Sequence, residues 1–380
     1  MTGLSRISAT CECGLLALAF SAQSLSAQTV VGGPSDDRPL GLRLERLWSV
    51  GGVDDEELVF STLYDKDVAT DANGRLLVID RTEFRVVEFD SRGRQTRTFG
   101  AKGLGPGELT APLSIEVVSS GAIQVFDAVK SAIVVFGADG RVLPELRMPL
   151  RVRQFRHLAN GQGIGTSQRR DTVRLVALRE DALVPLMTLV LPPSRSTPPV
   201  CRLTDYPARP VFAPNLTWAL RDNLLVASTG AFSLTVFEGT ERRRTLARDT
   251  PRRRSTPALA RQHLGPGETM QLLGERPCTI PAEMILSVAE VSPTLPAYEA
   301  VAIAPDNRIW ATRFTVRAEP GVADVYDAVR GYLGSVPLGS AKPVAFLSTG
   351  ELVSLEHDHE EVPQLVVYAL RRAPQPPRPR

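Results

Sequence analysis

A unit of four short strand-like runs, each ended by a turn, first appears at residues 68–100 and returns about every 40 residues. In this first unit the runs are Val68–Thr70, Leu76–Ile79, Val86–Phe89 and Thr96–Phe99. Short runs rich in Val, Ile and Leu between turn residues are typical of β-strands. Because one small sheet cannot bury its own apolar faces, repetition of the unit predicts a closed or stacked array of sheets.

The turns carry the residues that tight hairpins require. Asp71 and Gly74 bracket the turn after the first run, and Asp90 and Gly93 bracket the turn after the third. Asp at the first position accepts hydrogen bonds from the turn backbone, and Gly at the last position tolerates a positive φ. These signals predict antiparallel hairpins within each unit.

Six such units predict an all-β fold, a six-bladed β-propeller with four-stranded blades, spanning residues 28–371. The predicted blades are residues 63–100, 112–149, 151–192, 215–250, 297–337 and 342–371. The last unit has only three strand signals, whereas the alternating segment Leu42–Trp48 has no unit of its own. We therefore expect residues 42–49 to close the last blade as its outer strand, which removes an open sheet edge.

Residues 251–296 interrupt the strand pattern. Two stretches that begin with proline, Pro257–His263 and Pro281–Ala289, have helical character, and Pro is favoured in the first turn of a helix. The sequence therefore predicts a short helical insertion between blades 4 and 5.

Residues 1–27 have the features of a signal peptide. Arg6 precedes the apolar run Gly14–Phe20, and the small residues Ser26 and Ala27 precede Gln28. The apolar run is too short to span a bilayer. We predict an exported protein, periplasmic or extracellular, without a transmembrane segment. The Pro- and Arg-rich residues 372–380 predict a disordered tail.

Export would leave Cys201 and Cys278 in an oxidising compartment, because Cys11 and Cys13 fall within the predicted signal peptide. Two cysteines in that setting tend to pair, so a disulfide is favoured. Two free buried thiols remain the main alternative. A metal pair or a nucleophile has less support, because neither cysteine has a suitable histidine neighbour in the sequence.

The first two units resemble NHL repeats. The resemblance lies in Val68–Arg75, Phe84–Asp90 and Thr98–Glu108, and the whole of residues 42–371 resembles the exported six-bladed propellers of bacteria. It implies four-stranded blades around a central channel. Propellers of this kind bind proteins, nucleic acids or small ligands, and some relatives are lyases or lactonases, so the fold does not determine the function.

The charge distribution does not favour nucleic acid as a partner. The formal net charge is +2, and the basic clusters are limited to Arg242–Arg244 and Arg252–Arg254. Predicted export argues against RNA, and charged side chains on an outer strand also protect it from mispairing. We expect a monomer whose partner is a protein or a small ligand.

Five polar residues lie where the first strand of a unit is predicted to start: Asp67, Arg153, Asn215, Glu299 and Lys342. Because first strands converge on the channel of a propeller, we expect these side chains at one channel mouth. Their mixed charge suits a zwitterionic or polar ligand, or a peptide terminus, better than a bare cation.

His357 and His359 belong to the only dense cluster of metal-type ligands. Side chains two residues apart on an extended segment project to the same side, so a metal site is geometrically allowed. The cluster lies between the second and third strands of the sixth unit, where a solvated loop is the favoured interpretation. We therefore predict no metal site there.

The leading hypothesis is a binding propeller, without a cofactor, that engages its ligand or partner at the channel face. The alternative is a lactonase-like hydrolase or a lyase with a divalent cation at the channel mouth. The sequence favours the binding protein and predicts no catalytic residue, because it shows no Ser-His-Asp arrangement. His157 and His263 stand alone and are expected to be structural or exposed.

Overall fold

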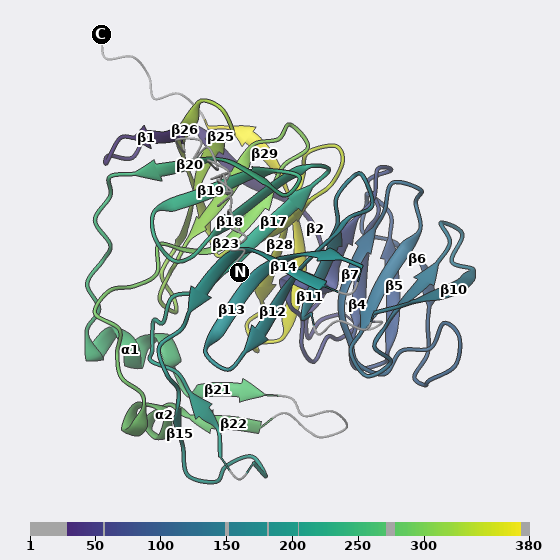
Figure 1. The fold of residues 1–380 in the computed structure, drawn as a ribbon, viewed down its shortest axis with the longest axis horizontal. Coiled ribbons are helices and arrows are strands. Elements are labelled where there is room, and N and C mark those ends of the chain that lie inside the picture. The colour runs from purple at the N-terminus through teal and green to yellow at the C-terminus, as the bar shows by residue number, and fades with distance from the viewer. Residues whose placement is uncertain are drawn as a thin grey trace, which may run out of the picture.

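The computed structural model describes residues 29–55, 58–148, 152–180, 182–203, 205–270 and 278–373. The predicted signal peptide, and the predicted tail beyond residue 373, lie outside the described residues. As predicted, the chain forms a six-bladed β-propeller (Figure 1). No helix in this part of the chain is long and apolar enough to cross a membrane.

The first three blades are each formed by four consecutive antiparallel strands. Blade 1 contains β3 (Val68–Thr70), β4 (Leu76–Asp80), β5 (Arg85–Phe89) and β6 (Gln95–Phe99). Blade 2 contains β7 (Pro112–Val117), β8 (Ile123–Asp127), β9 (Ala132–Phe136) and β10 (Val142–Arg147). Blade 3 contains β11 (Gln154–His157), β12 (Gly163–Arg169), β13 (Thr172–Arg179) and β14 (Ala182–Val190).

Blades 4 and 6 each take a strand from the N-terminal segment. Blade 4 contains β17 (Thr217–Arg221), β18 (Leu224–Ser228), β19 (Ser233–Glu238), β20 (Glu241–Arg248) and β1 (Thr29–Gly33). Blade 5 contains β23 (Tyr298–Ile303), β24 (Ile309–Arg313), β25 (Gly321–Asp327) and β26 (Gly331–Gly339). Blade 6 contains β27 (Pro343–Phe346), β28 (Leu352–His357), β29 (Pro363–Arg372) and β2 (Leu42–Gly51).

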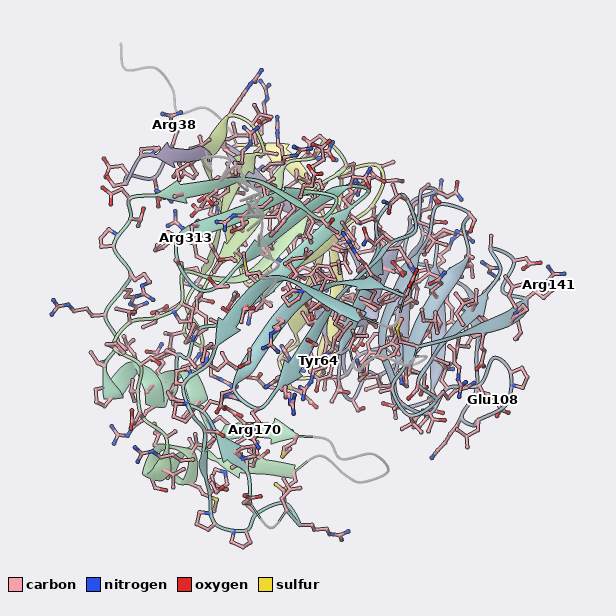
Figure 2. All side chains as sticks on the ribbon, viewed as in Figure 1. Arg38, Tyr64, Glu108, Arg141, Arg170 and Arg313 are labelled. Atoms are coloured by element: carbon pink, nitrogen blue, oxygen red, sulfur yellow. A yellow bond between two sulfur atoms is a disulfide. The ribbon has the colours of Figure 1, made fainter. Side chains whose placement is uncertain are left out.

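Burial changes from the middle to the outside of a blade. Every residue of β4 and of β9 is buried, whereas the outer strands β6 and β10 are mostly exposed or half-buried. Both faces of a blade pack against neighbouring blades, so its middle strands are continuous apolar runs. Charged side chains such as Glu108 and Arg141 lie at the outer end of blade 2 (Figure 2).

The predicted hairpin turns form as expected. The N–H of Gly74 donates to the carbonyl of Asp71 at 3.2 Å, and the N–H of Gly93 donates to that of Asp90 at 3.0 Å. Both glycines have a positive φ, +76° and +81°. This conformation favours glycine because a Cβ would be strained there.

The ring closes as predicted, through β2. This strand pairs antiparallel with β29, from Leu42 opposite Arg372 to Gly51 opposite Gln364. Leu42 and Leu44 pack on the apolar cluster between blades 5 and 6, and Trp48 and Val50 on the cluster between blades 6 and 1. One N-terminal strand therefore completes both interfaces of the last blade.

Trp48 also fixes the closing strand to blade 1. Its indole N–H donates to the carbonyl of Ser91 at 3.0 Å. A Cβ on Gly93 would lie 2.6 Å from the indole ring, so the turn needs glycine for its close approach to Trp48 as well as for its φ.

The sequence did not predict β1. It runs parallel to β20 and adds a fifth strand to blade 4, with Thr29 opposite Arg244 and Gly33 opposite Arg248. Its five residues contain two glycines and no alternation, so neither strand propensity nor periodicity identifies it.

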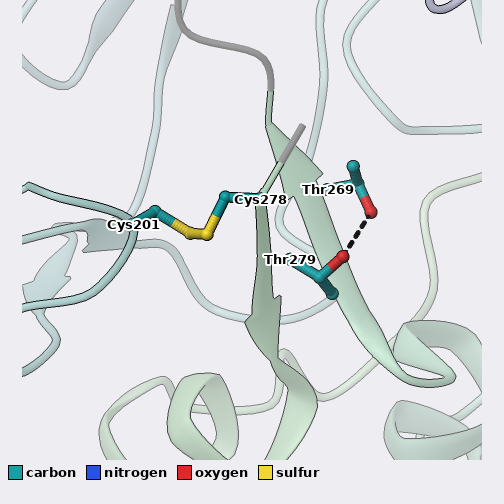
Figure 3. The surroundings of a disulfide bond; sticks show 4 residues. All are labelled: Cys201, Thr269, Cys278 and Thr279. Atoms are coloured by element: carbon teal, nitrogen blue, oxygen red, sulfur yellow. Dashed lines mark hydrogen bonds between the residues drawn. A yellow bond between two sulfur atoms is a disulfide. The ribbon is translucent and has the colours of Figure 1, made fainter. Parts of the chain in front are cut away.

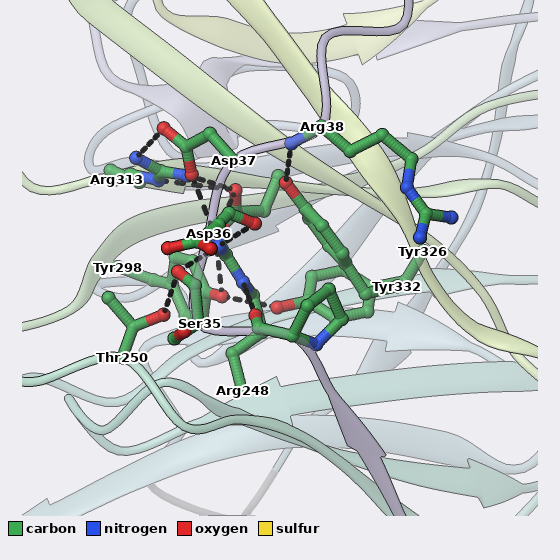
Figure 4. Close-up of polar contacts among 12 residues, drawn as sticks. Ser35, Asp36, Asp37, Arg38, Arg248, Thr250, Tyr298, Arg313, Tyr326 and Tyr332 are labelled. Carbon is green, nitrogen blue, oxygen red and sulfur yellow. Dashed lines mark hydrogen bonds and ion pairs between the residues drawn. The ribbon is translucent and has the colours of Figure 1, made fainter.

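A buried ion network anchors the segment that follows β1 (Figure 4). The Arg248 side chain is fully buried and lies over the Tyr332 ring, with its Cζ 4.1 Å from the ring centroid. Its guanidinium donates to Asp324 at 2.9 Å, to Asp37 at 3.1 Å and to the carbonyl of Ser35 at 2.8 Å. These contacts satisfy a charge that would otherwise be costly to bury.

Arg313 completes the network by pairing with the same two aspartates. Asp324 is fully buried and also accepts a hydrogen bond from the Tyr298 hydroxyl at 3.0 Å. The hydrogen bond from Arg313 is the largest influence on the pKa of Asp37 and holds it below the usual value. The network therefore joins the N-terminal segment to blades 4 and 5.

The predicted helical insertion between blades 4 and 5 is present. It contains α1 (Pro257–Leu264), β21 (Gly267–Met270), β22 (Cys278–Pro281) and α2 (Ala282–Val288). The hairpin of β21 and β22 was not predicted. Figure 1 shows the insertion beside the ring, next to the connection between blades 3 and 4, which carries β15 (Arg195–Ser196) and β16 (Pro207–Ala208).

The predicted disulfide between Cys201 and Cys278 is confirmed (Figure 3). It joins β22 of the insertion to the connection between blades 3 and 4, across a sequence separation of 77 residues. A cross-link over a loop of this length stabilises a fold by about 4 kcal/mol in the chain-entropy model. Together with a shared apolar cluster, it makes the insertion and this connection one unit.

We expect removal of the closing strand to destabilise the protein strongly. A chain that lacks all residues up to and including Gly51 exposes the edge of β29 and uncovers two apolar clusters. Its melting temperature should therefore fall by about 10 °C or more. A chain that lacks only the residues up to and including Gly33 retains β2 and serves as the control. If the longer truncation melts at the wild-type temperature, β2 does not close the ring.

We expect Asp324→Asn to lower the free energy of unfolding by about 3–5 kcal/mol, because it leaves the buried charge of Arg248 undercompensated. The control is Asp306→Asn, whose exposed pair with Arg308 at 3.3 Å should contribute less than about 1 kcal/mol. Urea unfolding measures both. Equal losses for the two variants would show that the network does not anchor the N-terminal segment.

Candidate functional site in the propeller channel

A cavity of about 860 Å³ occupies the channel. All six blades contribute to its lining, for example through Thr70, Glu116, Arg156, Trp218, Val301 and Ala345. It extends from Asp65 to the turns that follow the first strands, where Asn73, Ser120 and Asp222 line it. Its volume lies within the range of small-molecule sites, about 300–1,000 Å³.

Arg156 crosses this cavity. It belongs to β11 of blade 3, and its Nη2 donates to the carbonyl of Val68 on blade 1 at 3.3 Å. No carboxylate forms an ion pair with it among the described residues. Burial lowers the pKa of Arg156, and the more distant carboxylates of Glu116, Asp65 and Asp67 oppose that shift. A guanidinium stays protonated under these conditions, so the cavity contains a positive charge.

The neighbouring Glu116 carboxylate is paired with His157. One carboxylate oxygen lies 2.5 Å from His157 Nδ1, and the other accepts the His157 backbone N–H at 2.8 Å. Phe155 packs edge-on against the imidazole, with the ring centroids 4.5 Å apart. Glu116 is therefore fixed by this pair and is not a direct partner of Arg156.

Two residues of the cavity lining, Trp218 and Gln124, each have a buried polar atom with no hydrogen-bond partner among the described residues. These atoms, Trp218 Nε1 and Gln124 Oε1, have essentially no accessible surface, so they do not face the space inside the cavity. An unsatisfied buried polar group costs about 1–3 kcal/mol.

A second charged group in the lining is already compensated. Arg75 lies 2.6 Å from Asp71 and 2.9 Å from Glu88. It therefore differs from Arg156, whose direct partner among the described residues is a backbone carbonyl.

The five residues predicted at the channel rim all lie within two residues of the start of a first strand, yet none lines the cavity. Asp67 is fully buried and pairs with Arg81, at 2.8 Å to Nε. Arg153 is exposed and close enough to Lys66 to lower the pKa of that lysine, although burial is the larger cause. These two residues form one group.

The other three rim residues form a second group near the insertion. The Asn215 amide donates to the carbonyl of Glu299 at 3.4 Å, while the buried Asn215 Oδ1 has no hydrogen-bond partner in the described part of the chain. Burial raises the pKa of Glu299, and Lys342 opposes that shift. Burial and Lys342 also lower the pKa of His263 on α1. Ligand binding by the five rim residues stays a prediction.

The weak metal candidates lie apart from the cavity. His357 ends β28, and His359 follows in an exposed turn, 4.0 Å from Glu360. In the described ranges, no group of three or more His, Cys, Asp or Glu side chains is arranged to hold a metal ion.

A smaller cavity of about 270 Å³ is lined by residues at strand ends and connections of blades 4 and 5, among them Phe314, Pro320 and Val322. Its two arginines already pair with carboxylates, Arg253 with Glu319 and Arg313 with Asp37 and Asp324. It offers a ligand no free charge, so the channel cavity is the stronger candidate.

The sequence analysis missed the residues that line the channel. Arg156 and His157 are charged or titratable residues inside a first strand, whereas the same position in blade 1 is the apolar run Val68–Thr70. That departure from an apolar pattern was the available signal. Trp218 gave none, because an aromatic residue in a strand is ordinary core composition.

The comparisons with known proteins agree with this architecture. The DUF5128 family, described as a 6-bladed beta-propeller, matches residues 66–172. No curated protein matches the chain significantly.

Among solved structures, a candidate exported protein from Bacteroides fragilis is 12% identical, with a TM-score of 0.51, over 90% of this chain and 100% of that one. A DUF4221 family member from Bacteroides vulgatus is 12% identical, with a TM-score of 0.47, over 87% and 99% of the two chains. A streptogramin B lyase is 14% identical, with a TM-score of 0.42, over 87% and 98%. At these identities the likeness concerns the fold alone.

Proposed function

We propose that the chain is an exported β-propeller that binds a small ligand in its central channel. One observation carries the proposal: all six blades line the cavity, and Arg156 extends across it with a backbone carbonyl as its direct partner among the described residues. A concave site with a few convergent polar groups is the usual form of a small-molecule site. A flat docking face for a protein would not leave such groups inside the ring.

Two further features support an exported binding protein. Residues 1–27 have the pattern of a signal peptide, and the Cys201–Cys278 disulfide suits an oxidising compartment such as the periplasm or the cell exterior. The resemblance of the first two units to NHL repeats is consistent with ligand binding. The hydrolase or lyase alternative stays a prediction, because none of the described residues shows an arrangement specific to catalysis.

A variant that fills the channel tests the proposal. Ala345 is half-buried on β27 and lines the cavity, so Ala345→Phe places a ring in the space that a ligand would occupy. Ala182→Phe, on the exposed outer strand β14, is the matched control. The natively purified protein should carry or bind a small molecule in non-denaturing mass spectrometry, and only Ala345→Phe should lose it.

Thermal unfolding of both variants without ligand establishes that the fold is intact. Retention of the ligand by a folded Ala345→Phe variant would place binding outside the channel and contradict the proposal. The rim group of Asn215, Glu299 and Lys342 would then be the next site to test.

A further inference from the structure

We propose that His263 on α1 makes the packing of the insertion against the ring sensitive to pH. In neutral surroundings the uncharged imidazole packs between two phenyl rings, whereas in mildly acidic surroundings its protonation weakens that packing and loosens α1. A protein exported from the cytoplasm is exposed to the pH of its surroundings, and histidine is the side chain that titrates nearest to neutrality. The inference does not depend on what the channel binds.

His263 lies in the contact between the insertion and the rest of the protein. Its ring centroid is 5.2 Å from that of Phe212, in the connection between blades 3 and 4, and 5.1 Å from that of Phe314, which follows β24 of blade 5. Ala260, three residues earlier and therefore on the same face of α1, is fully buried in the cluster that contains Phe212. The face of α1 that carries His263 thus packs against both the connection and blade 5.

The Nδ1 atom of His263 lacks an acceptor for an added proton. It is buried and has no hydrogen-bond partner among the described residues. The neutral ring can hold its hydrogen on Nε2, in which case Nδ1 is only an acceptor. Protonation would turn Nδ1 into a buried donor beside phenyl rings, which offer it no carbonyl or carboxylate oxygen. A buried donor without an acceptor is destabilising, so the packed state disfavours the charged ring.

Two charged groups from other elements act directly on His263. Burial is the largest cause that lowers the pKa of His263 below its ordinary value, and the positive charge of Lys342, at the start of blade 6, lowers it further. Glu268 on β21 opposes the shift, but its carboxylate already accepts a hydrogen bond from the Tyr206 hydroxyl. The surroundings of His263 therefore favour the neutral imidazole.

The charges on and beside α1 are paired or exposed. The Arg317 side chain lies against the end of the helix at Gly265, and its guanidinium pairs with Glu361 at 2.5 Å. Arg261, on α1 itself, is exposed and lies 4.0 Å from Glu283. Neither pair supplies a carboxylate to the His263 ring.

The direction of the pH dependence follows from the lowered pKa. In the loosened state His263 regains the ordinary pKa of 6.5, so this state binds a proton more readily than the packed state. Packing of α1 is therefore unaffected above about pH 7.5 and weakens as the pH falls below 6.5. A difference of one pKa unit between two states changes their equilibrium about 10-fold.

One mouth of the channel adjoins this contact. Burial raises the pKa of Glu299, and Lys342 opposes that shift just as it opposes protonation of His263. Loosening of α1 would therefore change the surroundings of the rim group of Asn215, Glu299 and Lys342. The Cys201–Cys278 disulfide keeps the insertion tethered meanwhile.

Amide hydrogen exchange on the full mature chain, with its disulfide intact, tests this device. Exchange is measured at about pH 7.5 and about pH 5 and corrected for the intrinsic exchange rate at each pH. Residues 257–264 should lose protection by about 3- to 10-fold at the lower pH. The fully buried strand β9 serves as the internal reference and should keep its protection.

Substitutions identify the titrating group. His263→Phe, and His263→Gln as a second variant, cannot take up a proton, so protection of α1 should no longer depend on pH. His359→Phe is the matched control in an exposed turn and should behave as the wild type. Lys342→Met should reduce the loss, because it removes a positive charge that opposes protonation. An NMR titration of the imidazole signal that disappears in the His263 variants should give a pKa below 6.5.

A loss of protection that the His263 variants remove and His359→Phe retains would support the inference. Equal protection of α1 at the two pH values in the wild-type protein would overturn it without any variant. A loss that persists in a folded His263 variant would assign the pH dependence to another group and overturn it as well. A His263 signal that titrates at 6.5 or above would have the same consequence.

Discussion

Closure of the ring by β2 is the constraint on which the rest of the structure depends. Each blade buries its faces only against two neighbours, so a gap at the seam would expose apolar surface on two blades at once. Pairing of residues 42–51 with residues 364–372 removes that gap and brings the two ends of the propeller together. Trp48 then extends the contact to blade 1. The channel has a defined lining only because all six first strands are held in one closed ring.

Arg248 and Arg156 differ in how their charges are compensated. Arg248 is fully buried, and two aspartates, backbone carbonyls and an aromatic ring compensate its charge. Arg156 crosses the channel with one carbonyl as its direct partner. Burial of an arginine without a carboxylate is costly unless something else satisfies it. This contrast separates a structural arginine from one that is available to a ligand.

The sequence was sufficient for the architecture because repeats, turns and strand alternation are local signals. It also predicted the closing strand, the insertion and the disulfide correctly. The closing strand and the insertion are visible as departures from the regular strand pattern, and the disulfide follows from the two cysteines that remain after export. It missed β1, whose pairing with β20 depends on contacts far apart in the chain. It also missed the channel site. Asp67 was predicted at a channel mouth, but Arg81 already compensates its charge, and Arg156 was not predicted as a site residue. Whether a charged side chain has a partner depends on contacts between blades. These contacts join residues that are far apart in the sequence.

The central claim is that the channel cavity is where this propeller binds its ligand. A crystal structure of the full mature chain with its tightest-binding small molecule tests that claim most directly. The account predicts the ligand inside the ring, in contact with first strands of several blades. A ligand bound at the rim beside Asn215 and Lys342, outside the channel cavity, would contradict it.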